Sequence, residues 1–373
     1  MKKILALILT LVMALSLVAC GEKPVETPDE PEYKVAMVTD YGDITDQSFN
    51  QTTYEAGKEW CEANGVQFTY YKPSGDSTAE RVAMVDAAVV AGYNVIVLPG
   101  FAFGETLVEV ADVYPDVKFV ALDVAEGEGG FTATENVFSA VYQEELSGYM
   151  AGYAAVKLGY KHLGFLGGMA VPAVQRFGYG FLQGVDAAAK ELGIVGDIKV
   201  EYVYGNQFYG DADITAVMDT WYGEKGVECV FACGGGIWSS AAEAAAKVGG
   251  KVIGVDVDQA AIIDGAYGEG MTVTSAMKGL APTVQTVLSA IVLEDNWAAY
   301  AGKIETLGLV SADPEANYVQ IPMASTQFAE GFTAEDYAAL VAAMFEGTVA
   351  VSGDISAFPT TEVAVEQHAN IKG

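Results

Sequence analysis

The chain has 373 residues, of which 51% are hydrophobic and 18% charged, so it can fill a sizeable core and is not disordered. Its 50 carboxylates against 19 Lys and Arg give a net charge of −31, which repels phosphates and excludes nucleic-acid binding. Four cysteines are too few for a disulfide scaffold. At roughly 150 residues per domain, the length favours two domains.

The first 20 residues have the layout of a signal peptide. Lys2 and Lys3 form a short basic region, and the apolar run 4–18 is shorter than the roughly 20 residues that a membrane-spanning helix needs. The run ends in LVAC, which resembles the bacterial lipobox. This resemblance implies that Cys20 is lipidated and becomes the new N-terminus. We therefore predict a lipid-anchored protein on the extracytoplasmic face of the cell membrane.

Residues 21–32 are rich in proline and carboxylates and are expected to form a flexible, solvated tether. Three cysteines follow, at Cys61, Cys229 and Cys233. Cys229 and Cys233 lie in one predicted strand and are about 13 Å apart, too far for a disulfide. We expect all three cysteines to be buried and to act as small hydrophobic residues.

From residue 33 onward, short β-rich runs alternate with amphipathic helical stretches, and the pattern occurs twice. The predicted strands are 34–39, 67–71, 95–98, 118–122 and 138–141, then 162–166, 200–204, 229–232 and 251–255. A further short strand is predicted at 271–274. The predicted helices are 50–63, 78–91, 104–113 and 144–158, then 176–192, 211–222, 239–247 and 334–345. Such alternation produces parallel sheets with right-handed crossovers. The sequence thus predicts an α/β fold with two doubly wound parallel-sheet lobes joined by a hinge.

The lobes are predicted to be discontinuous along the chain. We place the N-terminal lobe at residues 33–140 plus about 258–300, and the C-terminal lobe at 141–257 plus about 301–373. Hinge segments are expected near 138–141, near Asp258 and in the C-terminal third.

Polar residues gather where the predicted strands end. Asp40, Asp123 and Asp256 each follow or end a strand, and the glycines 234–236 follow another. Ligands of open α/β sheets bind beyond the carboxyl ends of the strands. Two lobes with polar strand ends facing each other are typical of a clamp around a small molecule.

The segment 40–51 (DYGDITDQSFNQ) offers a first set of candidate ligand contacts. Ser48 is a candidate cap for the next helix. Phe49 is either a hydrophobic staple or an aromatic platform for a flat ring, beside the carboxylate of Asp40.

The segment 253–259 (IGVDVDQ) offers a second set. Asp256 and Asp258 lie two residues apart and could hold a hydroxyl pair or a divalent cation, but no further oxygen ligand follows at calcium-loop spacing, so no metal is predicted. Lys278 either points into the cleft or lies on the surface.

The glycine-rich segments 164–168 and 231–236 lack the phosphate-loop pattern and favour backbone approach to an uncharged ligand. Neither a nucleophile elbow nor a zinc-protease motif is present in the sequence. Paired carboxylates leave nucleoside or glycoside cleavage as an alternative. We predict a binding protein without enzymatic activity and without a cofactor.

Four segments in the same order resemble the basic membrane protein family. They are 38–57 (VTDYGDITDQSFNQTTYEAG), 164–185 (GFLGGMAVPAVQRFGYGFLQGV), 253–259 (IGVDVDQ) and 274–279 (TSAMKG). Proteins of this family are lipid-anchored substrate-binding proteins of ABC transporters with the type I periplasmic-binding-protein fold, and several bind purine nucleosides. The resemblance implies the same fold and a nucleoside ligand here.

The resemblance also implies roles for single residues. Asp40 and Asn50 would border the base, and Phe49 would stack on one of its faces. Asp123 would face the ligand. Asp256 would bind the ribose hydroxyls.

Further implied contacts come from the second half of the chain. Lys278 would assist at the ribose, and Gly235 would supply a backbone contact. Either Phe208 or Tyr204 would be the second aromatic of the sandwich. Trp238 stands where a small residue is more usual in the family and would narrow the pocket.

The implied function is capture of a purine nucleoside and its delivery to an ABC permease and ATPase by a monomeric, membrane-anchored receptor. Three alternatives remain open at this stage. They are a receptor for sensing, a sugar-binding protein and an extracytoplasmic enzyme that cleaves nucleosides.

Overall fold

The computed structural model describes residues 33–373, and the predicted signal peptide, Cys20 and the tether lie outside the described residues. A six-stranded parallel sheet has the order β11-β5-β4-β3-β1-β2. Its strands are β1 (Lys34–Val38), β2 (Gln67–Tyr71), β3 (Val95–Pro99), β4 (Lys118–Leu122), β5 (Val137–Tyr142) and β11 (Lys303–Leu307). This sheet and its helices are called the first lobe.

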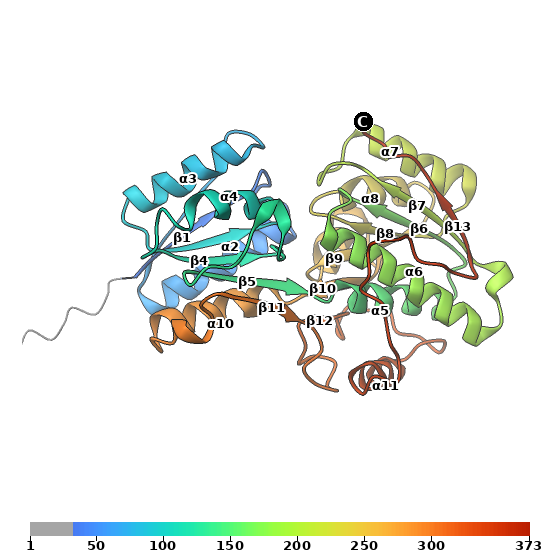
Figure 1. Cartoon of the computed structure of the whole chain (residues 1–373). Helices are drawn as coiled ribbons and strands as arrows, with labels where there is room; N and C mark the ends of the chain where they lie inside the picture. The colour runs from blue at the N-terminus through green and yellow to red at the C-terminus, as the bar shows by residue number, and fades with distance from the viewer. Residues whose placement is uncertain (1–32) are drawn as a thin grey trace, which may run out of the picture. The chain divides into compact units, whose positions relative to one another are not determined.

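A seven-stranded sheet has the order β12-β10-β9-β8-β6-β7-β13 and forms, with its helices, the second lobe (Figure 1). Its strands are β6 (His162–Gly167), β7 (Lys199–Tyr204), β8 (Cys229–Cys233), β9 (Lys251–Asp256), β10 (Thr272–Lys278), β12 (Val319–Gln320) and β13 (Ala364–Gln367). Only the short β12 pairs antiparallel among these described strands. The predicted α/β fold with two parallel-sheet lobes is confirmed.

Helices cover the two sheets. In the first lobe they are α2 (Phe49–Asn64), α3 (Thr78–Val90), α4 (Phe103–Val110) and α10 (Leu280–Val292). In the second lobe they are α5 (Glu144–Lys157), α6 (Pro172–Leu192), α7 (Ala212–Asp219), α8 (Trp238–Ala246), α9 (Ala260–Tyr267) and α11 (Ala334–Phe345). None of the helices within residues 33–373 combines the length and the apolar character that crossing a membrane requires.

The chain returns to the first lobe later than the sequence predicted. Residues 258–278 were expected in the first lobe, but β10 pairs with β9 and extends the second sheet as far as Lys278. The crossover therefore lies at Gly279 and not near Asp258. The strand β11 was expected in the second lobe, but it pairs with β5 of the first sheet.

The C-terminal strand β13 adds to the outer edge of β7, with Glu366 opposite Glu201 in the register. Residues 348–352 form no strand. Cys61, Cys229 and Cys233 are buried free thiols, as expected.

Candidate functional site

A cavity of about 580 Å³ is lined by residues of both lobes, which belong to one compact unit, Lys34–Gly373. It holds nine of the ten residues predicted to bind ligand. These are Asp40, Phe49, Asn50, Asp123, Phe208, Gly235, Trp238, Asp256 and Lys278. A cavity of this size is within the usual range for small-molecule sites.

The loop before α2 is shaped by Asp46. Its carboxylate accepts hydrogen bonds from the backbone N–H groups of Ser48 (2.9 Å), Asn50 (2.9 Å) and Gln51 (3.0 Å). The helix N-terminus is thus satisfied by Asp46, whereas the side chain of Ser48, the predicted cap, makes no capping bond. The side-chain amide of Asn50 also donates to Asp46, at 3.2 Å, and Asn50 lines the cavity.

Asp40 is a buried carboxylate at the end of β1. It accepts a hydrogen bond from the N–H of Gly42 at 2.6 Å. Burial raises the pKa of Asp40 to about 6, and the bond from Gly42 opposes this rise. A carboxyl group with this pKa can accept or donate a hydrogen bond near neutral pH.

Asp123 and Asp256 occupy matching positions in the two lobes. Asp123 follows β4 with φ 62°, and Asp256 ends β9 with φ 65°. Aspartate tolerates this left-handed conformation better than most residues. Burial raises the pKa of Asp123 to about 6 and also raises that of Asp256, in each case against the attraction of Lys278.

Lys278 is the buried cation of the cavity, and its side chain is only 2% exposed. Its ammonium bonds Asp123 and lies 3.4 Å from Glu144 Oε1 and 3.9 Å from Asp256 Oδ1. Burial would lower the pKa of Lys278, but these carboxylates outweigh burial and raise it. Lys278 therefore stays charged at any physiological pH.

Three aromatic rings surround the same ammonium. Its distances to the ring centroids are 4.7 Å for Phe49, 5.4 Å for Tyr142 and 5.7 Å for Phe177. Contacts within about 6 Å of a ring face are attractive for a cation. The rings and the carboxylates together fix the Lys278 side chain.

Three glycines pack directly against Phe208. A Cβ at Gly168 would lie 2.4 Å from the Phe208 ring, and one at Gly234 would lie 2.9 Å from it. Gly235 has φ 52°, and a Cβ there would meet the Phe208 carbonyl at 2.7 Å. The glycines of the two glycine-rich segments thus make room for Phe208, a purpose that the sequence did not indicate.

Tyr204, the alternative second aromatic, is not among the residues that line the cavity. Its ring packs edge-on against Phe165, and its hydroxyl is 2.9 Å from that of Tyr202. Of the two candidates, the structure brings only Phe208 to the cavity. Trp238 also lines the cavity, and its ring packs edge-on against Tyr267, with centroids 6.4 Å apart.

Sequence reasoning missed several residues that join the lobes at this site. Ser48 donates from Oγ to Asp256 Oδ2 at 2.6 Å, and Gln259 donates from its amide to the carbonyl of Gln47 at 3.0 Å. The Tyr41 ring lies 6.1 Å from that of Phe208, between centroids. The position of Tyr41 directly after Asp40 was the one available signal.

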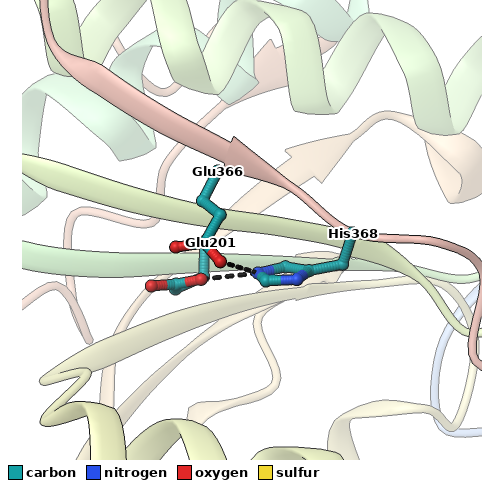
Figure 2. A group of neighbouring side chains, drawn as sticks. All are labelled: Glu201, Glu366 and His368. Carbon is teal, nitrogen blue, oxygen red and sulfur yellow. Dashed lines mark hydrogen bonds and ion pairs between the residues drawn. The ribbon is translucent and has the colours of Figure 1, made fainter.

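A group of potential metal ligands lies elsewhere, at the edge of the second sheet. Figure 2 shows Glu201, Glu366 and His368 turned toward one another, and their ligand atoms lie within 4.8 Å. The Lys225 ammonium lies 2.7 Å from Glu201, 3.2 Å from Glu366 and 3.5 Å from His368. An ammonium group thus already lies among the three ligand residues.

Glu201 is the centre of this ionic cluster. Burial would raise its pKa, but hydrogen bonds from Lys199, Lys225, His368 and His162 outweigh burial and lower the pKa to about 2. The cluster is a salt-bridge network that links β13 to β7. Its residues do not line the cavity.

Residues 33–312 match the model of the Bmp family, described as ABC transporter substrate-binding protein PnrA-like. The chain belongs to this family. The resemblance seen in the sequence is confirmed, and the members of this family are substrate-binding proteins of ABC transporters. Residues 313–373 lie beyond the matched segment.

Two curated relatives illustrate the family. The ABC transporter nucleoside-binding protein BmpA of Lactococcus lactis is 30% identical over 241 residues, which cover 61% of this chain and 65% of that protein. An uncharacterized lipoprotein of Pyrococcus abyssi is 31% identical over 216 residues, covering 56% of this chain and 52% of that protein. The matches thus span between half and two thirds of these relatives.

A solved structure has the same fold. The crystal structure of an ABC transporter solute-binding protein from Aeropyrum pernix superposes with a TM-score of 0.67 at 25% identity. The superposition covers 85% of this chain and 87% of that one. The type I solute-binding fold expected from the sequence is thereby confirmed.

Proposed function

We propose that the protein is a lipid-anchored extracytoplasmic receptor that binds a purine nucleoside in the cavity between its lobes and delivers it to an ABC importer. One observation carries this proposal. The cavity combines aromatic rings from both lobes, Phe49 and Phe208, with the buried carboxylate of Asp256 and that of Asp123, which is 10% exposed. A flat base and a ribose diol are the chemical partners of such a pair of features.

In this proposal the base lies between Phe49 and Phe208. Each stacking contact contributes roughly 1–3 kcal/mol. Asp40 and Asn50, on the first lobe, bind polar atoms at the edge of the base. Trp238 limits the size of the group that fits beside it.

The ribose hydroxyls donate to Asp123 and Asp256. A hydrogen bond to a charged acceptor contributes about 1.5–3 kcal/mol. Lys278 favours the ionised form of both carboxylates against the effect of burial. Gly235 adds a backbone contact. The two stacking contacts and two hydroxyl bonds together contribute roughly 5–12 kcal/mol. This range includes the roughly 8 kcal/mol that micromolar binding needs, before the cost of ordering.

The membrane anchor is proposed from the sequence of residues 1–20 and the lipoprotein name of the Pyrococcus relative. Cys20→Ser should move the protein from the membrane fraction to the soluble fraction and abolish labelling by radioactive palmitate. An unchanged membrane fraction after this substitution would refute the anchor. Delivery to a permease is tested by co-purification of the loaded protein with its transporter.

The ligand is tested by calorimetry with inosine, adenosine, guanosine and ribose. Phe49→Ala and Asp256→Ala should each weaken nucleoside binding strongly while the protein stays folded by circular dichroism. Ribose binding without nucleoside binding would instead support a sugar receptor. Free base and ribose appearing after incubation with inosine would support the enzyme.

A further inference from the structure

Glu144 and Arg176 do not line the cavity, yet both act on its buried cation. Glu144 is fully buried at the start of α5, with Oε1 at 3.4 Å from the Lys278 ammonium. Its other oxygen, Oε2, accepts a hydrogen bond from Arg176 Nε at 2.6 Å. A chain of contacts thus runs from Arg176 through Glu144 to Lys278.

Three carboxylates therefore compete for a single ammonium group. Lys278 bonds Oδ2 of Asp123, whereas Oδ1 of Asp123 is buried without a hydrogen-bond partner among the described residues. Oδ1 of Asp256 lies 3.9 Å from the ammonium, beyond a normal hydrogen bond. Because Glu144 takes part of the positive charge, Lys278 bonds one oxygen of Asp123 and makes no short bond to Asp256.

The backbone holds Glu144 and Arg176 in this arrangement. Helices α5 and α6 approach so closely that a Cβ at Gly148 would lie 2.2 Å from the Phe177 carbonyl, and one at Gly180 would lie 2.1 Å from that of Glu145. Glycine is the residue that allows such an approach. Glu144 and Arg176 lie near the N-terminal ends of these two helices, so their separation is fixed by the packing.

We propose that Glu144 and Arg176 are positioning residues for nucleoside binding, which rests on the function proposed above. Glu144 draws Lys278 away from full pairing with Asp123 and Asp256, so that an oxygen of each accepts a ribose hydroxyl. Arg176 holds Glu144 in place. Without the charge of Glu144, Lys278 pairs with both cavity carboxylates and occupies the acceptors that the ribose requires.

The substitution Glu144→Gln removes the charge of this side chain but keeps its shape. In Glu144→Gln, the affinity for inosine by calorimetry at pH 7.5 should fall about tenfold, the usual size for one lost charged hydrogen bond. In the ligand-free protein, the pKa of Asp123, followed by carboxyl NMR, should fall below the wild-type value. Other charges near Asp123 come from Lys278, Arg176 and Glu128, and none of these residues is substituted in this variant.

Matched variants separate positioning from folding. Glu191, on α6, is an exposed ion-pair partner of Lys157. Glu191→Gln should leave the inosine affinity and the Asp123 pKa at their wild-type values. Arg176→Met should reduce the affinity as Glu144→Gln does, and Arg176→Lys should restore part of it. If Glu144→Gln does not fold, the comparison of Arg176→Met with Arg176→Lys tests the inference instead.

An unchanged affinity and an unchanged Asp123 pKa in Glu144→Gln would overturn the inference. If the wild-type protein binds none of the nucleosides, the proposed function fails. A crystal structure of ligand-free Glu144→Gln still decides whether Glu144 positions Lys278, because the inference predicts an ammonium closer to Asp256 than 3.9 Å, and an unchanged distance would overturn it.

Discussion

The hydroxyl of Ser48 on the first lobe donates a hydrogen bond to the carboxylate of Asp256 on the second lobe, with an O···O distance of 2.6 Å. Both side chains are buried, and the bond spans 208 residues of sequence. It joins the lobes at the edge of the cavity and helps to ionise Asp256, since the bond lowers the pKa that burial raises.

Ser48→Ala should therefore weaken inosine binding about five- to tenfold, because a hydrogen bond to a charged acceptor contributes about 1.5–3 kcal/mol and part of it is replaced by water. Calorimetry of the variant measures the effect. Ser289→Ala is the control, because Ser289 accepts a hydrogen bond from Trp60 within the first lobe, at 2.9 Å. Equal losses of affinity in both variants would contradict the account.

Phe208→Ala should lower the affinity for purine nucleosides by roughly 1–3 kcal/mol, since it removes one face of the proposed sandwich. Tyr204→Phe should bind like the wild type, because its hydroxyl contacts Tyr202 and its ring lies outside the cavity lining. A titration series with inosine compares the two. An unchanged affinity in Phe208→Ala would contradict the placement of Phe208 as the second stacking ring.

The alternation of apolar strands and helices was enough to predict both lobes, because buried parallel strands such as β3 and β8 are apolar throughout. The misplaced boundary arose at β10, which carries the buried polar residues Thr272, Thr274 and Ser275. The edge strands β11 and β13 were missed because they are short and largely exposed. Such strands lack the apolar run that marks a buried one.

At the site, carboxylates at strand ends were predictable, because every strand end of a parallel sheet faces the same edge. The contacts between the lobes could not be predicted from the sequence. Ser48 was expected to cap α2 with its side chain, but the Asp46 carboxylate accepts the bonds of the helix N-terminus, and the Ser48 hydroxyl bonds Asp256. Glu144 gave no signal, since a charged residue at a helix start is usually exposed.

The raised pKa of Asp40 makes its ionisation a cost to folding. Its pKa is 3.8 in an unfolded chain and about 6 when folded, so the protonated form is favoured on folding. The stability that Asp40 contributes is present below pH 3.8 and is lost as the pH rises through about 6. Asp40→Asn should therefore stabilise the ligand-free protein at pH 7.5, by at most about 3 kcal/mol, and have little effect near pH 4.

Thermal unfolding at pH 4, 5, 6 and 7.5 measures how the stabilisation by Asp40→Asn depends on pH. Asp43→Asn is the matched control from the same loop, because the bond from Lys72 lowers the pKa of Asp43. That variant should gain no stability at neutral pH. If Asp40→Asn stabilised the protein equally at pH 4 and pH 7.5, the ionisation of Asp40 would not be the cause.

Gly148→Ala should destabilise the protein by more than about 2 kcal/mol, because the added methyl would overlap the Phe177 carbonyl and push α5 from α6. Gly265→Ala in α9 is the control, since a Cβ there meets no atom within 4 Å. It should stabilise its helix by roughly 0.5–1 kcal/mol. Urea unfolding of both variants gives the comparison, and equal effects would refute the close packing.

The most direct measurement is calorimetric titration of the ligand-free protein with inosine, guanosine, adenosine and ribose under one buffer condition. At least one purine nucleoside should bind with a dissociation constant at or below the micromolar range, and ribose should bind more weakly by several orders of magnitude. Heat signals no larger than buffer dilution for all the nucleosides would contradict it.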